Sequence, residues 1–189
     1  MYPFKRGMDL LFAIPLSAIF FLPMLLVCLL VWMSSGAPIF YWSNRIGRNN
    51  QIFSMPKFRS MQLKAPAVAT HLLENPNVYL TPAGSILRKT SIDEMPQLWS
   101  ILKGDMSLVG PRPALFNQED LIRLRTERGI HCLTPGLTGW AQVNGRDELS
   151  IEEKVRLDAE YLRRASFWLD IKILWMTFKK ALIRDGVSH

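Results

Sequence analysis

Residues 88–113, RKTSIDEMPQLWSILKGDMSLVGPRP, place two adjacent carboxylates, Asp93 and Glu94, between basic residues. Pro96 has no backbone N–H, so within a helix it is tolerated only in the first turn. A helix through residues 97–102 must therefore begin at or just before these acids, which puts both at its N-terminus. The unpaired N–H groups there favour ionised carboxylates. We predict that Asp93 is ionised at neutral pH and available as a nucleophile or metal ligand.

The same stretch ends in Gly110-Pro111-Arg112-Pro113, in which two prolines enclose one arginine. Pro111 has a fixed φ, and Pro113 pushes Arg112 toward an extended conformation. The backbone at Arg112 therefore loses little conformational freedom when a ligand binds. This suits bidentate binding of a phosphate by the guanidinium. A rigid turn without a ligand is the alternative interpretation.

Ser91 and Glu94 also match the S-x-x-E pattern of a capping box, in which the two residues satisfy each other's backbone N–H groups. Such matches are common on surface helices. Residues 88–113 taken alone are thus compatible with an ordinary helix start as well as with a catalytic site.

Two further motifs accompany this stretch: KFRSM at residues 57–61 and PGLTGWAQVNGR at residues 135–146. With them, the chain resembles the bacterial sugar transferase family, the monotopic phosphoglycosyl transferases, from residue 5 to residue 174. The resemblance implies transfer of a sugar 1-phosphate from a UDP-sugar to polyprenol (undecaprenyl) phosphate, with release of UMP. It implies Mg²⁺ as the cofactor and a first membrane step in glycoconjugate or polysaccharide assembly. The chain is similar to the short form of the family, a catalytic core alone.

The resemblance also implies roles for individual residues. Asp93 would attack the β-phosphorus to form an aspartyl phosphosugar, and Glu94 would hold Mg²⁺ together with it. Arg88 and Arg112 would bind phosphate. The other substrate-binding candidates are Lys57, Arg59 and Arg146.

Residues 38–47 and 51–61 are rich in strand-forming residues and flank a short polar turn, which predicts a β-hairpin. In the second arm, Lys57 and Arg59 alternate onto one face, where they could neutralise one diphosphate together. A solvated edge strand protected by lysine is the alternative.

Other patterns predict helices and one more turn. Ser150 and Glu153 match a capping box at the start of a helix. The last helix carries aromatic residues on one broad face and lysines largely elsewhere, which is typical of an interfacial helix, although a buried core helix is equally compatible. The turn Asn144-Gly145 places Arg146 just past a chain reversal. The expected helices span residues 81–88, 114–128, 150–164 and 166–184. Together these patterns predict a mainly α protein with a small β-hairpin, an α+β fold.

The composition restricts the kind of partner. The 189 residues suffice for one domain, and 23 basic against 16 acidic residues give a net charge of +7, which indicates an anionic partner. The hydrophobic fraction of 49% and the lack of a nucleic-acid-binding signature favour a membrane surface and a phosphorylated substrate over nucleic acid. Two cysteines, Cys28 and Cys132, predict neither a disulfide framework nor a metal site.

Residues 10–33 contain no charged side chain. As a helix they would be about 36 Å long, enough to cross a hydrocarbon core of about 30 Å. The run is too long for the apolar region of a cleaved signal peptide, and no A-x-A site follows it. We therefore expect residues 1–36 to insert into the membrane and residues 37–189 to form a catalytic domain with a C-terminal interfacial helix.

The topology of the apolar segment follows from proline and charge. Pro23 lies near its middle, removes a backbone hydrogen bond and should kink the helix. Basic residues flank both ends of the segment. Because positive charge favours the cytosolic side of a membrane, both ends should lie on that side, which a re-entrant helix would satisfy. Members of the similar family bend at a Ser-Pro or like dipeptide, where this chain has Leu22-Pro23, and act on the cytosolic face of the bacterial inner membrane. A straight bitopic span is the alternative, because proline is common in spanning helices.

Two other functions fit parts of the pattern. A membrane-bound, metal-dependent phosphohydrolase could use the same carboxylates and would release sugar phosphate without a lipid acceptor. A non-enzymatic basic membrane scaffold would recruit anionic partners, but it has no need of acids among its cations. The sequence favours the transferase and leaves the sugar, the pathway and the oligomeric state open.

Overall fold

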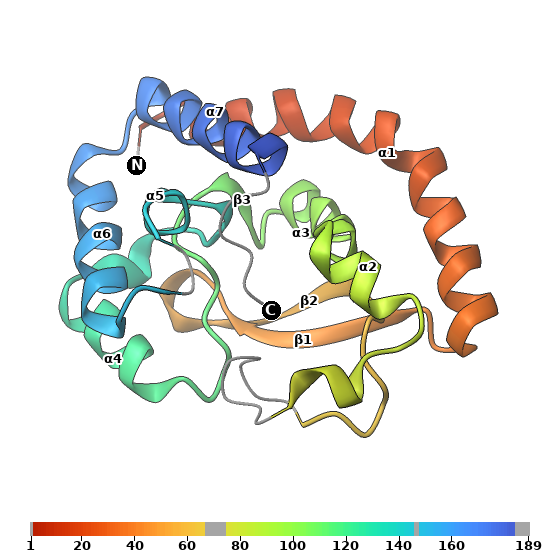
Figure 1. Ribbon diagram of the computed structural model, residues 1–189. Coiled ribbons are helices and arrows are strands. Elements are labelled where there is room, and N and C mark those ends of the chain that lie inside the picture. Colours follow the sequence, from red (N-terminus) through yellow and green to blue (C-terminus); the bar gives the residue numbers. More distant parts are fainter. Residues whose placement is uncertain (1, 67–74, 146–147, 184–189) are drawn as a thin grey trace.

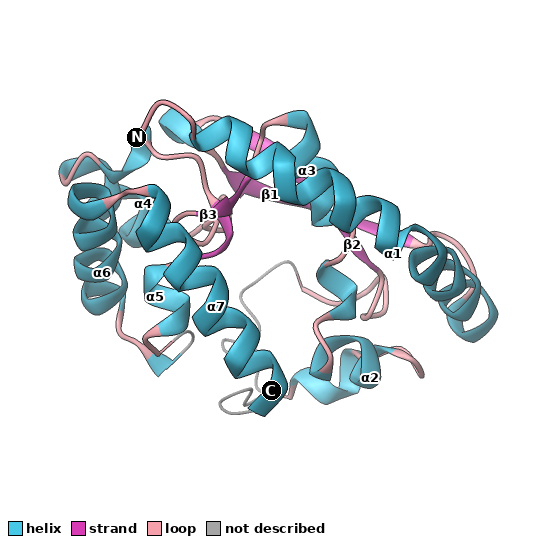
Figure 2. Ribbon diagram, turned by 90° about the horizontal axis from the view of Figure 1, so that it is seen from above, coloured by secondary structure: helices cyan, strands magenta, loops and turns pink. Residues whose placement is uncertain are grey.

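The computed structural model describes residues 2–66, 75–145 and 148–183. In these residues helices surround two small sheets, which confirms the predicted α+β class (Figures 1 and 2). The helices are α1 (Lys5–Ser35), α2 (Gly84–Lys89), α3 (Gln97–Lys103), α4 (Glu119–Glu127), α5 (Trp140–Val143), α6 (Ile151–Arg164) and α7 (Phe167–Ile183). The strands are β1 (Phe40–Ile46), β2 (Ile52–Phe58), β3 (Ser107–Val109) and β4 (Gly136–Thr138). Short 3₁₀ turns lie at Arg48–Asn50, Pro76–Tyr79, Ile92–Glu94 and Ile130–Cys132.

β1 and β2 form the predicted hairpin. They pair antiparallel, with Phe40 opposite Phe58 at the open end. Asn49 and Asn50 in the turn have left-handed backbones, with φ values of 55° and 60°, which asparagine tolerates better than most residues. The hairpin lies across the centre of the molecule, and β2 contacts α3 (Figure 1).

β3 and β4 form a parallel pair that the sequence pattern did not predict, because three residues are too few to show alternation. Val109 pairs with Thr138. Next to this pair the backbones meet so closely that a Cβ on Gly136 would lie 2.1 Å from the backbone nitrogen of Gly110. Only glycine fits there, and the glycine-rich β4 segment is therefore pressed against the loop that carries Arg112.

The main core lies between α3, β3, α6 and α7. Its fully buried side chains include Ile101, Val109 and Ile173. A second cluster joins Val31, near the end of α1, to Phe58 of β2. This second cluster fastens the C-terminal part of α1 to the hairpin.

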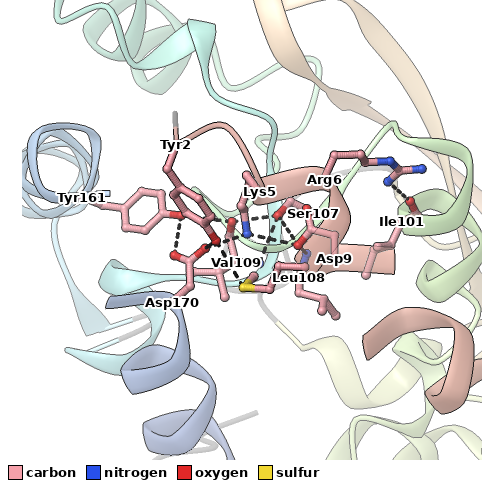
Figure 3. Close-up of polar contacts among 11 residues, drawn as sticks. Tyr2, Lys5, Arg6, Asp9, Ile101, Ser107, Leu108, Val109, Tyr161 and Asp170 are labelled. Carbon is pink, nitrogen blue, oxygen red and sulfur yellow. Dashed lines mark hydrogen bonds and ion pairs between the residues drawn. The ribbon is translucent and has the colours of Figure 1, made fainter. Parts of the chain in front are cut away.

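A buried polar cluster fixes the start of α1 to the core (Figure 3). Lys5 Nζ lies 3.1 Å from Asp9 Oδ1 and 2.8 Å from Asp170 Oδ2 of α7. The hydroxyl groups of Tyr2 and Tyr161 both donate to Asp170. Burial, and then the charge of Asp170, raise the pKa of Tyr161, so that it stays a protonated donor. These partners are needed because a buried charge without them is strongly destabilising.

The same end of α1 also contacts β3 and α3 (Figure 3). Asp9 Oδ1 accepts hydrogen bonds from Ser107 Oγ and from a backbone N–H of β3. Arg6 donates to the carbonyl oxygens of Ile101 and the residue after it, at the C-terminus of α3, where the helix dipole favours a cation. Lys5 and Arg6, which the charge pattern placed at the membrane boundary, thus make specific contacts within the domain.

Arg59 holds the other end of α1. Its guanidinium donates to the carbonyl oxygens of Ser35, Gly36 and Ala37 at 2.5–2.9 Å. The first of these carbonyls belongs to the last residue of the helix and the other two follow it, where intrahelical donors run out. Arg59 is only 5% exposed. Both ends of the apolar helix are therefore held on the same domain by buried polar groups.

Most of α1 between these ends is exposed. The helix is long and apolar enough to cross a membrane, and only 6% of its most apolar 18-residue segment is buried. Its exposed side chains include Phe21, Leu22 and Leu26. Pro15 and Pro23 lie within it, and Figure 1 shows it running along the top of the molecule and then turning down the right side. This length and exposure indicate association with a membrane.

α2 begins later than predicted. The pattern placed its N-terminus at Thr81 and Pro82, but the helix starts at Gly84. Thr81 Oγ1 donates to the carbonyl oxygen of Ser60 instead of capping the helix, so a contact with the end of the hairpin replaces the local one.

α7 has two faces. Leu169 and Ile173 are buried in the main core, whereas Trp168 is 77% and Trp175 60% exposed. The pattern that was compatible with either an interfacial or a core helix thus belongs to a helix with a core face and an exposed aromatic face.

Candidate active site

Asp93 and Glu94 lie in the 3₁₀ turn directly before α3. Their predicted position at a helix start is confirmed, although α-helical geometry begins only at Gln97. Ser91 has a left-handed backbone, with φ 56°, and its side chain makes no capping hydrogen bond. The capping-box interpretation is therefore wrong here, and the Glu94 side chain is directed to cations from other segments.

Glu94 brings two basic residues together. Its Oε1 lies 2.7 Å from Lys57 Nζ of β2 and 3.3 Å from Arg112 Nη2. The side chains of Lys57 and Glu94 are mostly buried, so solvent screens this pair less than a surface pair. The hairpin, the turn before α3 and the loop after β3 each contribute one of the three residues.

Asp93 is the more buried acid, with 6% of its surface exposed. Burial is the largest influence on its carboxyl group and raises its pKa. The cations Lys57, Arg88 and Arg112 oppose this shift, and the carboxylate of Glu94 adds to it. The helix N-terminus alone predicted easy ionisation, but that prediction left out the cost of burying the charge. A carboxyl group with such a shift among fixed charges is a candidate catalytic residue.

Arg88 lies in the last turn of α2 and directs Nη1 to Met61 Sδ at 3.2 Å. Its charge acts on Asp93. The contact with Met61 brings the motif at residues 57–61 next to α2. Three of the predicted phosphate-binding cations, Lys57, Arg88 and Arg112, thus act on one buried carboxyl group.

Two arginines that the sequence pattern did not single out hold the Pro-Arg-Pro loop. Arg125 of α4 donates to the carbonyl oxygen of Arg112 at 2.8 Å and pairs with Asp158 of α6 at 2.6 Å. Arg45 of β1 donates to the carbonyl oxygen of Pro113 at 3.2 Å. Their acceptors are backbone carbonyls and a buried acid distant in the chain, so no local pattern predicts these contacts.

Arg45 also lies beside the acidic pair. Burial, and then the charge of Arg112, lower its pKa to about 10, whereas Glu94 raises it. Arg45 is therefore still a cation at neutral pH. Together with Glu94, Gln97 and Arg112 it lines a small pocket.

In a sequence comparison, the model of the family described as bacterial sugar transferase matches residues 1–184. The chain belongs to the bacterial sugar transferase family. The uncharacterized sugar transferase EpsL of Bacillus subtilis is 42% identical over 98% of the chain and 90% of that protein. The exopolysaccharide production protein ExoY of Rhizobium meliloti is 36% identical over 96% of the chain and 87% of that protein. The undecaprenyl-phosphate galactose phosphotransferase of Salmonella typhimurium is 38% identical over 80% of the chain.

The transferase spans most of EpsL and ExoY but only 35% of the length of the Salmonella protein. The family and the name of the Salmonella relative confirm the prediction of a phosphotransferase enzyme. The residues discussed above lie within the part that the family model matches.

Two predicted substrate-binding residues of the transferase are not placed in this cluster. Arg59 directs its guanidinium to the carbonyl oxygens at the end of α1. This contact gives Arg59 a structural role, and a role in phosphate binding stays a prediction that the geometry does not support. Arg146 lies outside the described residues.

The ligands that the site offers suit Mg²⁺ better than a metal that binds through three or more protein side chains. Among the described residues, no group of three or more His, Cys, Asp and Glu side chains could hold a metal ion. Mg²⁺ uses one or two carboxylates and completes its shell with water and substrate phosphates. Asp93 and Glu94 can supply those carboxylates, and the metal stays a prediction.

Proposed function

We propose that this transferase moves a sugar 1-phosphate from a UDP-sugar to polyprenol (undecaprenyl) phosphate and releases UMP. The observation that carries the proposal is the buried carboxyl group of Asp93, next to Glu94 and under the influence of three cations. The names of two relatives support the substrate classes: the Salmonella protein above, and a UDP-N-acetylgalactosamine-undecaprenyl-phosphate N-acetylgalactosaminephosphotransferase of Aeromonas hydrophila, 35% identical. The reaction would be the first membrane step in assembling a polysaccharide or glycoconjugate.

The chemistry that we propose has two steps at one phosphorus atom. A carboxylate oxygen of Asp93 attacks the β-phosphorus of the UDP-sugar, the bond from that phosphorus to the UMP oxygen breaks, and UMP leaves. An oxygen of the lipid phosphate then attacks the aspartyl phosphosugar, and the acyl phosphate bond breaks to restore Asp93. Splitting the transfer in this way replaces one difficult displacement by two easier ones.

Both steps bring anions together, so fixed positive charge is the main requirement of the site. Lys57, Arg88 and Arg112 already act on Asp93, and in this proposal they also bind the diphosphate. Arg125 and Arg45 limit the movement of the loop that carries Arg112 by binding its carbonyl groups.

Mg²⁺ bound to Asp93 and Glu94 would neutralise phosphate charge and polarise the phosphoryl oxygens. Glu94 is suited to this role because Lys57 and Arg112 fix the position of its carboxylate.

The proposal includes a re-entrant α1 and a catalytic domain on the cytosolic face of the inner membrane. It is supported by the two ends of α1: Lys5 is held by Asp170, and the carbonyls after Ser34 are held by Arg59. A straight span would put these ends on opposite sides of the bilayer and break one of the two sets of contacts. The exposed aromatic face of α7, with Trp168 and Trp175, suits an interfacial position on the same side.

The proposed function is tested by incubating the purified protein with a panel of UDP-sugars, polyprenol phosphate and Mg²⁺ and measuring UMP. We expect repeated turnover with at least one UDP-sugar, only when both the lipid acceptor and Mg²⁺ are present. Continuous release of free sugar phosphate without acceptor would show a phosphohydrolase instead. No UMP from any donor, or an unchanged rate for Asp93→Asn, would rule out the proposed chemistry.

A further inference from the structure

Gln97 is the first residue of α3, and its side chain is almost fully buried, with 3% of its surface exposed. It lines the small pocket that also includes Arg45, Glu94 and Arg112. Among the described residues, no side chain or backbone group forms a hydrogen bond with its amide. The amide is not one of the fully buried polar groups that lack a partner among the described residues, so its atoms reach the open space of the pocket, where water or a ligand can bind them.

The walls of this pocket offer donors to an anion. Arg45 binds Ser43 Oγ through Nε and the Pro113 carbonyl through Nη1, and in the described part of the chain Nη2 has no hydrogen-bond partner. Arg112 adds a second guanidinium. Glu94 is the acid in the wall of the pocket. Because it is paired with Lys57 and Arg112, it repels a bound anion less than an unpaired carboxylate would. Guanidinium N–H groups with an amide N–H beside them suit phosphate oxygens.

The pocket lies next to the nucleophile but does not include it. Of the two acids, Glu94 lines the pocket, and Asp93 is not among the described residues that do. In a displacement at phosphorus the leaving oxygen lies opposite the attacking one, with the transferred group between them. We therefore assign the pocket to the departing phosphoryl group, because the transferred one must contact Asp93 itself.

We infer that Gln97 and Arg45 bind the phosphoryl group that leaves with UMP. This inference rests on the proposed function for the identity of the nucleotide. Gln97 donates an amide N–H to a phosphate oxygen, and Arg45 adds the N–H of Nη2 while its other nitrogens hold the loop.

The test is calorimetric binding of UMP and of uridine to the detergent-solubilised full-length protein. Gln97→Met keeps the length of the side chain and removes the amide that would donate to the phosphate, and we expect at least about tenfold weaker UMP binding with unchanged uridine binding. Gln97→Glu places a carboxylate against the phosphate and should weaken UMP binding further. Gln51→Met changes an exposed glutamine in the hairpin turn and serves as the matched control, with no expected effect.

Because the amide has no partner, Gln97→Met should not lower the unfolding temperature, which separates binding from folding. Wild-type affinity for UMP in both Gln97 variants would overturn the inference. So would an equal loss for uridine, which would assign the pocket to the base, or a loss seen only with Mg²⁺, which would make the amide a metal ligand. If the wild type releases no UMP from any UDP-sugar but Gln97→Met still loses UMP affinity, the proposed function fails and the phosphate pocket stands.

Discussion

Asp93 is under opposing influences, and their balance links stability to activity. Burial and Glu94 raise its pKa, and three cations lower it, with burial dominant. The folded protein therefore binds the Asp93 proton more tightly than the unfolded chain. Stability from this residue is highest at low pH and is lost as the pH rises from the ordinary aspartate range through the raised pKa.

Asp93→Asn should remove the loss of stability that occurs as the pH rises. The same substitution should abolish transfer of the sugar phosphate. We expect UMP release to fall by at least about a thousandfold, because the nucleophile is gone. The unfolding temperature at neutral pH should rise above that of the wild type, and the difference should shrink as the pH falls below the ordinary aspartate range. A variant less stable than the wild type at neutral pH would show that the cations outweigh burial.

Lys57→Met should shift the pH dependence of the reaction. In the proposed mechanism Asp93 must be ionised to attack, so we expect activity to be lost as the pH falls through its pKa. Removing Lys57 takes away an opposing charge, and the acidic limb of kcat/KM should move to higher pH, with a loss of about a hundredfold near neutrality. Lys103→Met, at an exposed lysine of α3, is the control and should leave the profile in place. An unshifted profile in Lys57→Met would contradict the assignment of the limb to Asp93.

At the scale of elements, the loop with Arg112 depends on contacts with neighbouring helices and strands. Arg125 joins α4 to α6 through Asp158, and its side chain is 12% exposed. Arg125→Met leaves Asp158 buried without its cation, which should lower the free energy of unfolding by about 3–5 kcal/mol. It should also reduce activity, because the Arg112 carbonyl loses its donor. Arg123→Met, an exposed arginine of the same helix, should cost no more than about 1 kcal/mol in a denaturant titration. Equal effects of the two substitutions would refute this assignment.

The two S-x-x-E matches show how far sequence patterns predict elements. Ser150 and Glu153 form the predicted capping box at the start of α6. Ser91 and Glu94 have the same spacing but do not, because Lys57 and Arg112 arrive from distant segments and pair with Glu94. The pattern predicts where a helix starts, and only tertiary contacts decide what its acid does.

The same limit explains which residues of the site the sequence revealed. Motifs predicted Asp93 and Arg112 because adjacent acids and enclosing prolines are local signals. Arg125 and Arg45 have ordinary surroundings in sequence, and Gln97 lies in the central motif but carries no local signal of its own. The roles of all three depend on carbonyl groups and a pocket that form only in the fold.

At the scale of the whole molecule, the apolar helix and the catalytic domain form one unit. The ends of α1 are joined to α7 and to the segment just after β2. In the proposed re-entrant topology these anchors would set the depth of the domain at the bilayer, so that an acceptor with its phosphate at the membrane surface could meet a donor from water.

Labelling with a membrane-impermeant maleimide should place both ends of α1 on one side. In a background with Cys28 and Cys132 replaced by serine, Phe4→Cys and Gln51→Cys provide exposed thiols near the start of α1 and in the hairpin turn. We expect both to react in inverted inner-membrane vesicles and neither in spheroplasts. Reaction of one thiol from each side would show a bitopic span and contradict the re-entrant topology.

The central claim is that Asp93 carries the sugar phosphate between donor and acceptor. The most direct measurement uses a UDP-sugar that supports turnover, labelled with radioactive phosphorus in its β-phosphate, and omits the lipid acceptor. We predict a burst of about one UMP per enzyme molecule and label bound to denatured wild-type protein, but none on Asp93→Asn. Label on Asp93→Asn at the wild-type level, or wild-type turnover with no label on the protein at any time, would contradict the account.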